Sequence, residues 1–377
     1  MKVLVVSPFF EPAFKGGGPI QSLTALINAR EPKYGVKVLT SNYDLGSRCP
    51  VTDHADKWIQ LRSFQVLYSS TLRTMIQSLV VELRSSEPPD LVYLNSFFDS
   101  RFAILPQVLA RVLRWPSSKI LIAPRGELQE GALAIKSRKK KLYLKSFRAL
   151  RLHNGLLWHV SSFAEEQDVV RQFGDSAKVF VRENEVSLPS TAVRRERRDP
   201  GACRLIFASR ISEKKGLHLL LEALSQTEAE VYLTIVGGFE EGSYERKCRT
   251  LAASLPKNIR VEFLGALPRE DLLGVLQHSD LLVLPTAGEN FGHIIPEALS
   301  TGCPVMCSEL TPWTSRLQEG GGLTVDTLEI KDWSRMLEKF VRLGEPGWLA
   351  ASHRSSETYN FWRIADRGDH IFTRVFG

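Results

Sequence analysis

Cysteine pairs and long apolar runs are both missing from this 377-residue chain. Its cysteines are odd in number and scattered, with no CxxC pair, which argues against a disulfide framework and against a structural zinc site. They are Cys49, Cys203, Cys248, Cys303 and Cys307. The longest apolar runs, such as 279–285, fall far short of the ~18 residues that a membrane span needs. We therefore expect a cytoplasmic protein without a transmembrane helix.

The glycine fingerprint of nicotinamide-dependent enzymes is also missing. A GxGxxG motif directly after the first strand, followed about twenty residues later by an acidic residue, predicts a two-domain dehydrogenase. Neither feature follows the first apolar run, 2–8. This class of enzyme is therefore disfavoured.

What is present is an alternation of short apolar runs and helical segments. In the first half, the β-branched runs 2–8, 36–41, 90–96 and 119–124 are separated by segments with helical spacing, such as 20–29. Continuous apolar strands of this kind suit a parallel sheet that is buried on both faces and has right-handed crossover helices. The fold class is therefore α/β, with a doubly wound parallel sheet.

The pattern breaks at the polar stretch 190–204 (STAVRRERRDPGACR) and then resumes. The second half has strand-like runs at 204–210, 231–238, 260–265, 280–285, 303–308 and 322–326, and helical segments at 216–226, 243–254 and 269–278. A chain of this length is too long for one ordinary core. We expect two Rossmann-like domains, at 1–189 and 190–354, with the C-terminal helix 355–377 packed back on the first.

Ligands of open α/β sheets bind outside the carboxyl ends of the strands, and two such domains that face each other create one central cleft. After the first strand, Gly16, Gly17 and Gly18 precede a helix that is expected to begin near Ile20. A glycine loop that opens a helix brings backbone N–H groups to a phosphate. A flexible glycine turn explains this loop equally well, so both interpretations stay open.

Basic residues follow the first strand of the second half. Arg210 lies at the carboxyl end of that strand, and Lys215 precedes Gly216 and a helix. A guanidinium offers a bidentate fork and an ammonium a point charge, and together they are suited to neutralise a diphosphate. We interpret both residues as functional and their neighbour Lys214 as solvated.

The segment 284–305 (LPTAGENFGHIIPEALSTGCPV) is the most specific in the chain. Glu289 and Glu297 have seven residues between them, and positions 290–292 lie at an expected helix N-terminus. Backbone N–H groups at such a place are able to hold a sugar or a diphosphate. A helical Glu297 is able to accept hydrogen bonds from ribose hydroxyls.

Together these segments resemble the retaining glycosyltransferases of family 4, among the glycosyl transferases group 1, which have the GT-B fold of two Rossmann-like domains facing a central cleft. The resemblance spans nearly the whole chain and rests on GGGP, APRGEL, SRISEKKG, LGALPREDL and ENFGHIIPEALSTGCPV. It implies a hexosyltransferase that moves a sugar from a nucleotide-diphosphate sugar to an acceptor and retains the anomeric configuration.

The resemblance also implies roles for residues. Arg210 and Lys215 hold the diphosphate, Glu289 contacts donor-sugar hydroxyls as the third member of the catalytic set, and Glu297 binds the nucleotide ribose. The further donor-binding residues are Gly16, Gly17, Gly18, Gly238, Gly265, Leu267, Asn290, Phe291 and Gly292. Arg125 and Gly126 are expected on the acceptor side. Many relatives have a histidine where this chain has Arg125, although a subset shares the PRG sequence.

No metal ion or other cofactor is expected beside the nucleotide sugar. The chain contains no Asp-x-Asp motif, which disfavours the metal-dependent sugar transferases of another fold. The resemblance implies front-face transfer, in which Arg210, Lys215 and backbone donors stabilise the leaving phosphate.

The net charge of +7 raises the question of anionic partners. The stretch from Lys136 to Arg151 has no acidic residue and interleaves basic with apolar side chains. It predicts either a peripheral helix on the inner membrane surface, facing a lipid-linked, polysaccharide or lipopolysaccharide acceptor, or a helix packed on its own sheet. The alternatives are a catalytically degenerate sugar- or nucleotide-binding relative and, less favoured because no recognition module is present, a nucleic-acid-binding protein.

Overall fold

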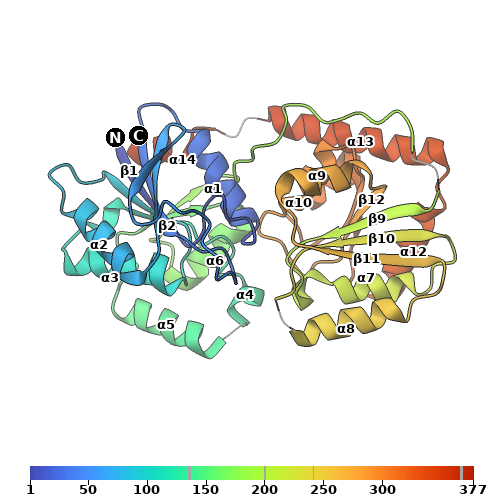
Figure 1. Ribbon diagram of the computed structural model, residues 1–377, viewed down its shortest axis with the longest axis horizontal. Helices are drawn as coiled ribbons and strands as arrows, with labels where there is room; N and C mark the ends of the chain where they lie inside the picture. Colours follow the sequence, from blue (N-terminus) through green and yellow to red (C-terminus); the bar gives the residue numbers. More distant parts are fainter. Residues whose placement is uncertain (135–136, 199–200, 241, 366–367) are drawn as a thin grey trace. The chain divides into compact units, whose positions relative to one another are not determined.

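The computed structural model describes residues 1–134, 137–198, 201–240, 242–365 and 368–377. The chain forms two compact units, Met1–Ser187 together with Arg367–Gly377, and Leu188–Asp366 (Figure 1). Both units consist of a largely parallel sheet between helices, so the predicted α/β class is confirmed. Lys136, the first residue of the predicted basic stretch, lies outside the described residues.

The sheet of the first unit has the strand order β3-β4-β2-β1-β5-β6-β7-β8. Its strands are β1 (Lys2–Ser7), β2 (Gly35–Ser41), β3 (Trp58–Leu61), β4 (Phe64–Ser69), β5 (Leu91–Leu94), β6 (Ile120–Ile122), β7 (Leu157–Val160) and β8 (Lys178–Val181). The pairing is parallel except between β3 and β4. The segments between and after the strands include the helices α1 (Gly18–Asn28), α2 (Leu72–Leu83), α3 (Leu105–Val112), α4 (Glu130–Ala134), α5 (Ser137–Ala149), α6 (Phe163–Phe173) and α14 (Ile371–Phe376), and the short turns η1 (Ser100–Ile104) and η2 (Ser117–Lys119).

Alternate residues of the central strands enter two separate hydrophobic clusters. In β1, Leu4 and Val6 belong to one cluster, whereas Val3 and Val5 belong to the other. Successive side chains of a strand point to opposite faces, so both faces of this sheet are covered. The near-continuous apolar runs that predicted β1, β2, β5 and β6 have this physical origin.

The sheet of the second unit has the order β11-β10-β9-β12-β13-β14, and each pair of neighbouring strands in this order is parallel. Its strands are β9 (Cys203–Ala208), β10 (Val231–Val236), β11 (Ile259–Gly265), β12 (Leu281–Leu284), β13 (Val305–Ser308) and β14 (Gly322–Val325), which confirms the predicted runs. Its helices are α7 (Leu217–Leu224), α8 (Gly242–Ala253), α9 (Arg269–Gln277), α10 (Ile294–Ser300), α11 (Thr314–Arg316), α12 (Ile330–Val341) and α13 (Glu345–Ile364), with the turns η3 (Glu213–Lys215) and η4 (Leu317–Gly321).

Each sheet reverses its strand order at one place near its centre. In the second unit the chain runs from β9 to β10 and β11, and then returns to place β12 on the other side of β9. In the first unit it runs from β1 to β2 and later places β5 on the other side of β1. Such switch points open a crevice at the carboxyl ends of the two central strands, which is the usual ligand site of open α/β sheets.

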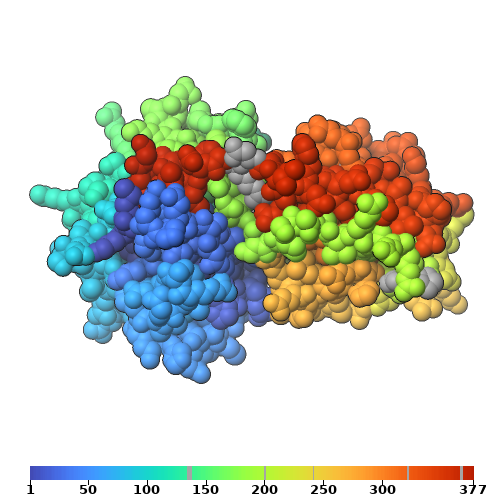
Figure 2. Space-filling view, turned by 90° about the horizontal axis from the view of Figure 1, so that it is seen from above, coloured from blue at the N-terminus to red at the C-terminus, as the bar shows by residue number. Residues whose placement is uncertain are grey.

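The C-terminal segment differs from the prediction. The long helix α13 belongs to the second unit, where Trp348, Tyr359 and Trp362 are buried. Only the last short helix, α14, lies in the first unit, and Figure 2 shows red C-terminal atoms beside the blue N-terminal part of this unit. The Phe372 ring meets the Tyr34 ring edge-on. The expectation that the whole of 355–377 packs on the first domain is therefore wrong, because the aromatic side chains of α13 complete the core of the second unit. Of the helices in the described ranges, none has both the length and the apolar character needed to cross a bilayer.

Candidate functional site

The crevice between β9 and β12 holds the predicted catalytic pair Lys215 and Glu289. The Lys215 Nζ lies 2.5 Å from Glu289 Oε1, and the two side chains are only 17% and 9% exposed. Lys215 ends the turn η3 after β9, and Gly216 follows it with φ 74°. A Cβ atom at Gly216 would lie 2.0 Å from the carbonyl oxygen of Pro285, at the end of β12. Glycine is therefore required for the two loops to approach so closely.

Backbone hydrogen bonds fix the loop after β12 on both sides. The Ala287 N–H donates to the Lys214 carbonyl at 2.7 Å, and the Glu289 N–H donates to Leu310 at 3.0 Å. The indole of Trp313 donates to the carbonyl of the buried Phe291 at 2.7 Å. Lys214 is thus part of the packed loop and half-buried, which corrects its interpretation as a solvated residue.

Two further ion pairs hold the other predicted charged residues. Glu297, 3% exposed, has its carboxylate 3.3 Å from the Arg269 guanidinium at the start of α9. Arg210, at the end of β9, pairs with Glu240 at 2.6 Å, and the Arg210 side chain is half exposed. The sequence pattern did not indicate Arg269 or Glu240, because each lies about 30 residues from its partner and belongs to no local motif.

The turns after β10 and β11 lie next to this crevice. The Gly237 N–H donates to the Gly265 carbonyl at 2.7 Å, and the Ile211 N–H donates to the Gly238 carbonyl at 2.8 Å. The structure thus gathers at one edge of the second sheet the predicted residues Arg210, Lys215, Gly238, Gly265, Leu267, Glu289, Asn290, Phe291, Gly292 and Glu297. Their roles in binding stay predictions.

The glycine loop lies at the carboxyl end of β1 in the first unit. Its helix α1 begins at Gly18, two residues earlier than expected, and Gly17 adopts φ 67° as the residue before it. The N–H groups of Phe14 and Lys15 both donate to one carboxylate oxygen of Asp44, at 2.9 and 3.0 Å. The approach to the loop is therefore anchored, while a Cβ atom at Gly17 would meet nothing within 4 Å.

Arg125 follows β6 and lies in a network of hydrogen bonds near the switch point of the first sheet. Its guanidinium donates to Asn95 Oδ1 and to the Tyr93 hydroxyl, both at 2.8 Å, and to Asn184 Oδ1. Asn95 follows β5 and donates in turn to the Ser7 hydroxyl at 3.3 Å. The predicted acceptor-side residue is therefore held by three side chains from two parts of the chain, at β5 and after β8, none of which the sequence singled out.

Behind Arg125 lies the buried residue His159, whose pKa is lowered well below its usual value, mainly by burial and then by the Arg125 charge. The carbonyl of Arg182, 3.3 Å from Nε2, is only able to accept a hydrogen bond, so Nε2 carries the proton. Nδ1 then accepts from the Tyr93 hydroxyl at 2.8 Å. Burial also raises the pKa of Tyr93 to about 12.

The lowered pKa of His159 predicts a loss of stability in acid. Below pH ~6.5 the unfolded chain protonates this histidine and the folded chain does not, so the free energy of unfolding falls as the pH falls, by about 1.4 kcal/mol per pH unit. The variant His159→Gln should lose this contribution, giving a shallower pH dependence of the urea unfolding midpoint between pH 5 and 7. Equal slopes for both proteins would contradict a neutral folded histidine.

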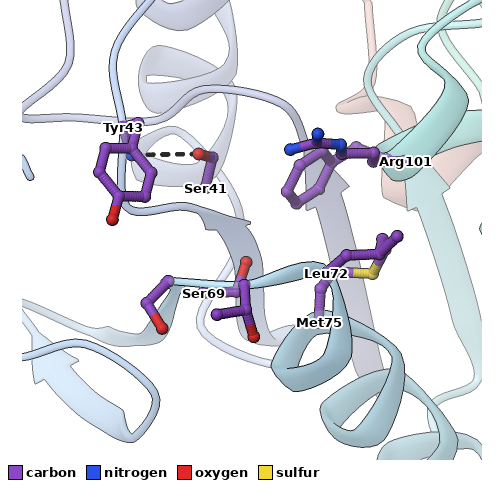
Figure 3. A pocket seen from close by; sticks show the side chains of 9 residues that line it. Ser41, Tyr43, Ser69, Leu72, Met75 and Arg101 are labelled. Atoms are coloured by element: carbon purple, nitrogen blue, oxygen red, sulfur yellow. Dashed lines mark hydrogen bonds between the residues drawn. The ribbon is translucent and has the colours of Figure 1, made fainter. Parts of the chain in front are cut away.

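A small hollow lies at the carboxyl ends of β2 and β4, with a volume of about 70 Å³. It is lined mainly by hydroxyl side chains and by residues of α2 and η1: Ser41, Tyr43, Ser69, Ser70, Thr71, Leu72, Met75, Arg101 and Phe102. Figure 3 shows the Arg101 side chain on the side opposite Tyr43. The hollow therefore offers polar and aromatic contacts at the same edge of the sheet as the glycine loop.

The buried cysteines Cys303 and Cys307 carry free thiols whose pKa burial raises to about 12. Their interpretation as buried, apolar side chains in a strand segment agrees with the structure, since Cys307 lies within β13 and Cys303 lies two residues before it. Within the described ranges, no group of three or more histidine, cysteine or acidic residues is placed to share a metal ion.

Solved structures show the class of fold. The Anabaena protein HepE, in complex with UDP-glucose, superimposes with a TM-score of 0.70 at 18% identity, over 100% of this chain and 98% of that one. WaaG, a glycosyltransferase involved in lipopolysaccharide biosynthesis, gives a TM-score of 0.58 at 13% identity, over 100% and 98% of the two chains. The chain thus has the GT-B fold of two Rossmann-like parallel-sheet domains.

Sequence similarity to a known family covers part of the chain, within the second unit. Residues 192–349 match the family described as glycosyl transferases group 1. The chain is 32% identical over 143 residues to the D-inositol 3-phosphate glycosyltransferase of Corynebacterium urealyticum, and 31% identical over 180 residues to that of Rhodococcus jostii. The matches cover 36% and 45% of this chain and only 34% and 39% of the two relatives.

Proposed function

We propose that the chain is a retaining glycosyltransferase of family 4 that transfers a hexose from a nucleotide-diphosphate sugar. The observation that carries this proposal is the Lys215–Glu289 pair, held at 2.5 Å in the switch-point crevice of the second unit. A cation and a carboxylate in this arrangement suit two neighbouring parts of a nucleotide sugar, the diphosphate and the sugar attached to it. The cation meets the diphosphate, and the carboxylate meets sugar hydroxyls.

In the proposed reaction the bond between the anomeric carbon and the diphosphate oxygen breaks. The acceptor hydroxyl forms the new bond on the same face, and its proton passes to the leaving phosphate. Arg210 and Lys215 stabilise the charge that grows on this phosphate. Glu297 binds the ribose, the turns at Gly238 and at 265–267 contact the base, and the loop 16–18 contacts the diphosphate.

The acceptor is proposed to be a lipid-linked, polysaccharide or lipopolysaccharide intermediate, bound by the first unit. The names of the relatives, which include an inositol-phosphate glycosyltransferase and a protein of lipopolysaccharide biosynthesis, support acceptors of this polar and anionic kind. Arg125, Gly126 and the hydroxyl-lined hollow beside Arg101 are the proposed contacts. No nucleic-acid partner is proposed.

Transfer is proposed to proceed without a metal ion. The positive charges of Arg210 and Lys215 are expected beside the diphosphate, where they take the role that a metal ion has in other transferases. Addition of EDTA should leave the rate nearly unchanged. A strict requirement for Mg²⁺ or Mn²⁺ would contradict this part of the proposal.

The nucleotide is identified most directly by thermal denaturation in the presence of UDP, GDP or ADP. The preferred nucleotide should raise the unfolding temperature most, since a ligand of the native state stabilises it by mass action. The Arg210→Ala variant should lose most of this shift. If none of the nucleotides shifts the wild type, nucleotide-sugar transfer is the wrong function. Nucleotide binding without any transfer would favour the degenerate relative.

We further propose that α5 docks on the inner surface of an anionic membrane. Leu144 and Phe147 of this helix are buried in the core of the first unit, so its apolar stripe does pack on its own sheet. Its outer face nevertheless combines basic side chains with an exposed leucine, Leu142, followed by Leu150 just beyond the helix end. Each basic residue near an anionic leaflet contributes roughly 1 kcal/mol, which supports reversible attachment.

Flotation with anionic liposomes tests this attachment. Wild-type protein should float at low salt and detach as salt rises. The triple change Lys139→Glu, Lys141→Glu and Lys145→Glu should abolish flotation; Lys140 is left intact because it donates to the Ala132 carbonyl. A matched triple, Arg246→Glu, Lys247→Glu and Lys257→Glu, alters the same charge on exposed residues of the second unit and should still float. Equal behaviour of both triples would contradict docking through α5.

A further inference from the structure

Arg125 forms no ion pair with a carboxylate within the part of the chain that the structure describes. Its hydrogen-bond acceptors are two amide oxygens and a phenol, on Asn95, Asn184 and Tyr93. The Glu165 carboxylate, close by, instead accepts the N–H of Gly126 at 2.6 Å and that of Ser161 at 2.8 Å. A guanidinium partly withdrawn from water without an anion is costly, so its presence here requires a reason.

The three side chains that accept hydrogen bonds from Arg125 are themselves neutral. Tyr93 is completely buried, and its hydroxyl donates a hydrogen bond to Nδ1 of His159. The other ring nitrogen of His159 donates a hydrogen bond to the Arg182 carbonyl. With a pKa of about 12, Tyr93 keeps that proton at neutral pH. The network therefore orients the guanidinium without neutralising it.

The backbone of Arg125 adopts an unfavourable conformation, and two N–H groups of its guanidinium donate to none of the three acceptors named above. Arg125 has φ 54°, in the left-handed region that residues with a Cβ atom rarely adopt. Of the five N–H groups of an arginine, three are used by Asn95, Asn184 and Tyr93, which leaves one on each terminal nitrogen. Asn95, which donates to Ser7 at the end of β1, places this fork beside the switch point of the first sheet.

We propose that Arg125 binds a phosphoryl oxyanion of a substrate through these two N–H groups. A pre-oriented guanidinium fork matches the bidentate geometry of phosphate oxygens. The inference rests on the proposed glycosyl transfer, since the oxyanion belongs either to a phosphate next to the acceptor hydroxyl or to the leaving diphosphate. In either case Arg125 makes the site specific for an anionic group. A neutral side chain at this position does not provide this specificity.

Inorganic phosphate is the probe for this site. The full chain is titrated with it at constant ionic strength, with chloride making up the difference, and binding is followed by phosphorus NMR line broadening. Arg125→Gln should weaken phosphate binding by at least about tenfold, and Arg125→Lys, which keeps the charge but not the fork, by less. The matched control is Arg114→Gln, since Arg114 is exposed and also left-handed, with φ 57°. Its phosphate affinity should be that of the wild type.

The outcomes separate the proposal from its alternatives. Absence of phosphate binding by the wild type, or equal binding by the folded Arg125→Gln variant, overturns it. The titration is then repeated with saturating UDP, GDP or ADP. Displacement of phosphate, together with weaker nucleotide binding by Arg125→Gln, assigns the oxyanion to the leaving diphosphate. Simultaneous binding assigns it to the acceptor. If no nucleotide binds but Arg125-dependent phosphate binding persists, the proposed function fails and the oxyanion site remains.

Discussion

Replacing Lys215 by methionine is expected to lower the rate of sugar transfer by at least about a hundredfold, the usual effect of removing one preorganised group that stabilises transition-state charge. Lys215 is only 17% exposed and lies 2.5 Å from Glu289. Its charge therefore acts in a site of low water content, where electrostatic interactions are strong. The measurement is kcat and KM for transfer from the nucleotide sugar identified by thermal denaturation.

The Lys215→Met variant leaves the largely buried Glu289 carboxylate without its partner, so a second variant is needed to separate structure from chemistry. Lys215→Met with Glu289→Gln removes both charges and should recover stability but not activity. Lys257→Met alters an exposed lysine before β11, at the other end of the sheet, and should keep wild-type kcat. Recovery of transfer in the double variant would show that Lys215 acts only by balancing Glu289.

The variant Gly237→Ala should lower the free energy of unfolding of the second unit by about 3 kcal/mol or more, a magnitude reached when strain and overpacking combine. Gly237 has φ 135°, and a Cβ atom there would lie 1.7 Å from the Ser209 carbonyl oxygen. That oxygen belongs to the segment between β9 and Arg210, so the backbone of the site must shift. Urea denaturation of the variant measures the loss.

The adjacent Gly238 provides the matched control. A Cβ atom at Gly238 meets nothing within 4 Å, and this residue is not in the left-handed region. Gly238→Ala should therefore change stability by less than about 0.5 kcal/mol. If the turn contacts the nucleobase as proposed, the same variant should still weaken nucleotide binding. Equal stabilities for the two variants would contradict the close approach at Gly237.

Burial on both faces explains why so many strands were predictable. All six strands of the second unit lie near the expected ranges, because a parallel sheet covered by helices leaves a continuous apolar run in the sequence. The strands β4, β7 and β8 of the first sheet were not predicted, and neither was its antiparallel edge strand β3. The residues of β3 are half-buried or exposed, so the apolar run is shorter and interrupted.

Residues of the site were predictable where they belong to local sequence motifs. Residues that reach the site only through contacts in the folded protein were not. Lys215 and Glu289 were expected from separate motifs 74 positions apart, and the structure joins them in one contact. The partners of Arg125, by contrast, are neutral side chains on β5, after β5 and beyond β8. Nothing in their own sequence surroundings marks them, since only the fold brings them to one guanidinium.

The return of the chain to the first unit through α14 makes the second unit an insertion within the first. Leu188–Asp366 is one continuous segment, while the first unit needs residues from both ends of the chain. If the proposed function holds, an exchange of donor preference with a related protein therefore requires a transferred segment with two junctions, near 187 and 367. In a chimera with a single junction, α14 comes from the other protein. The native contact between Phe372 and Tyr34 is then replaced by whatever residue the other protein has at position 372.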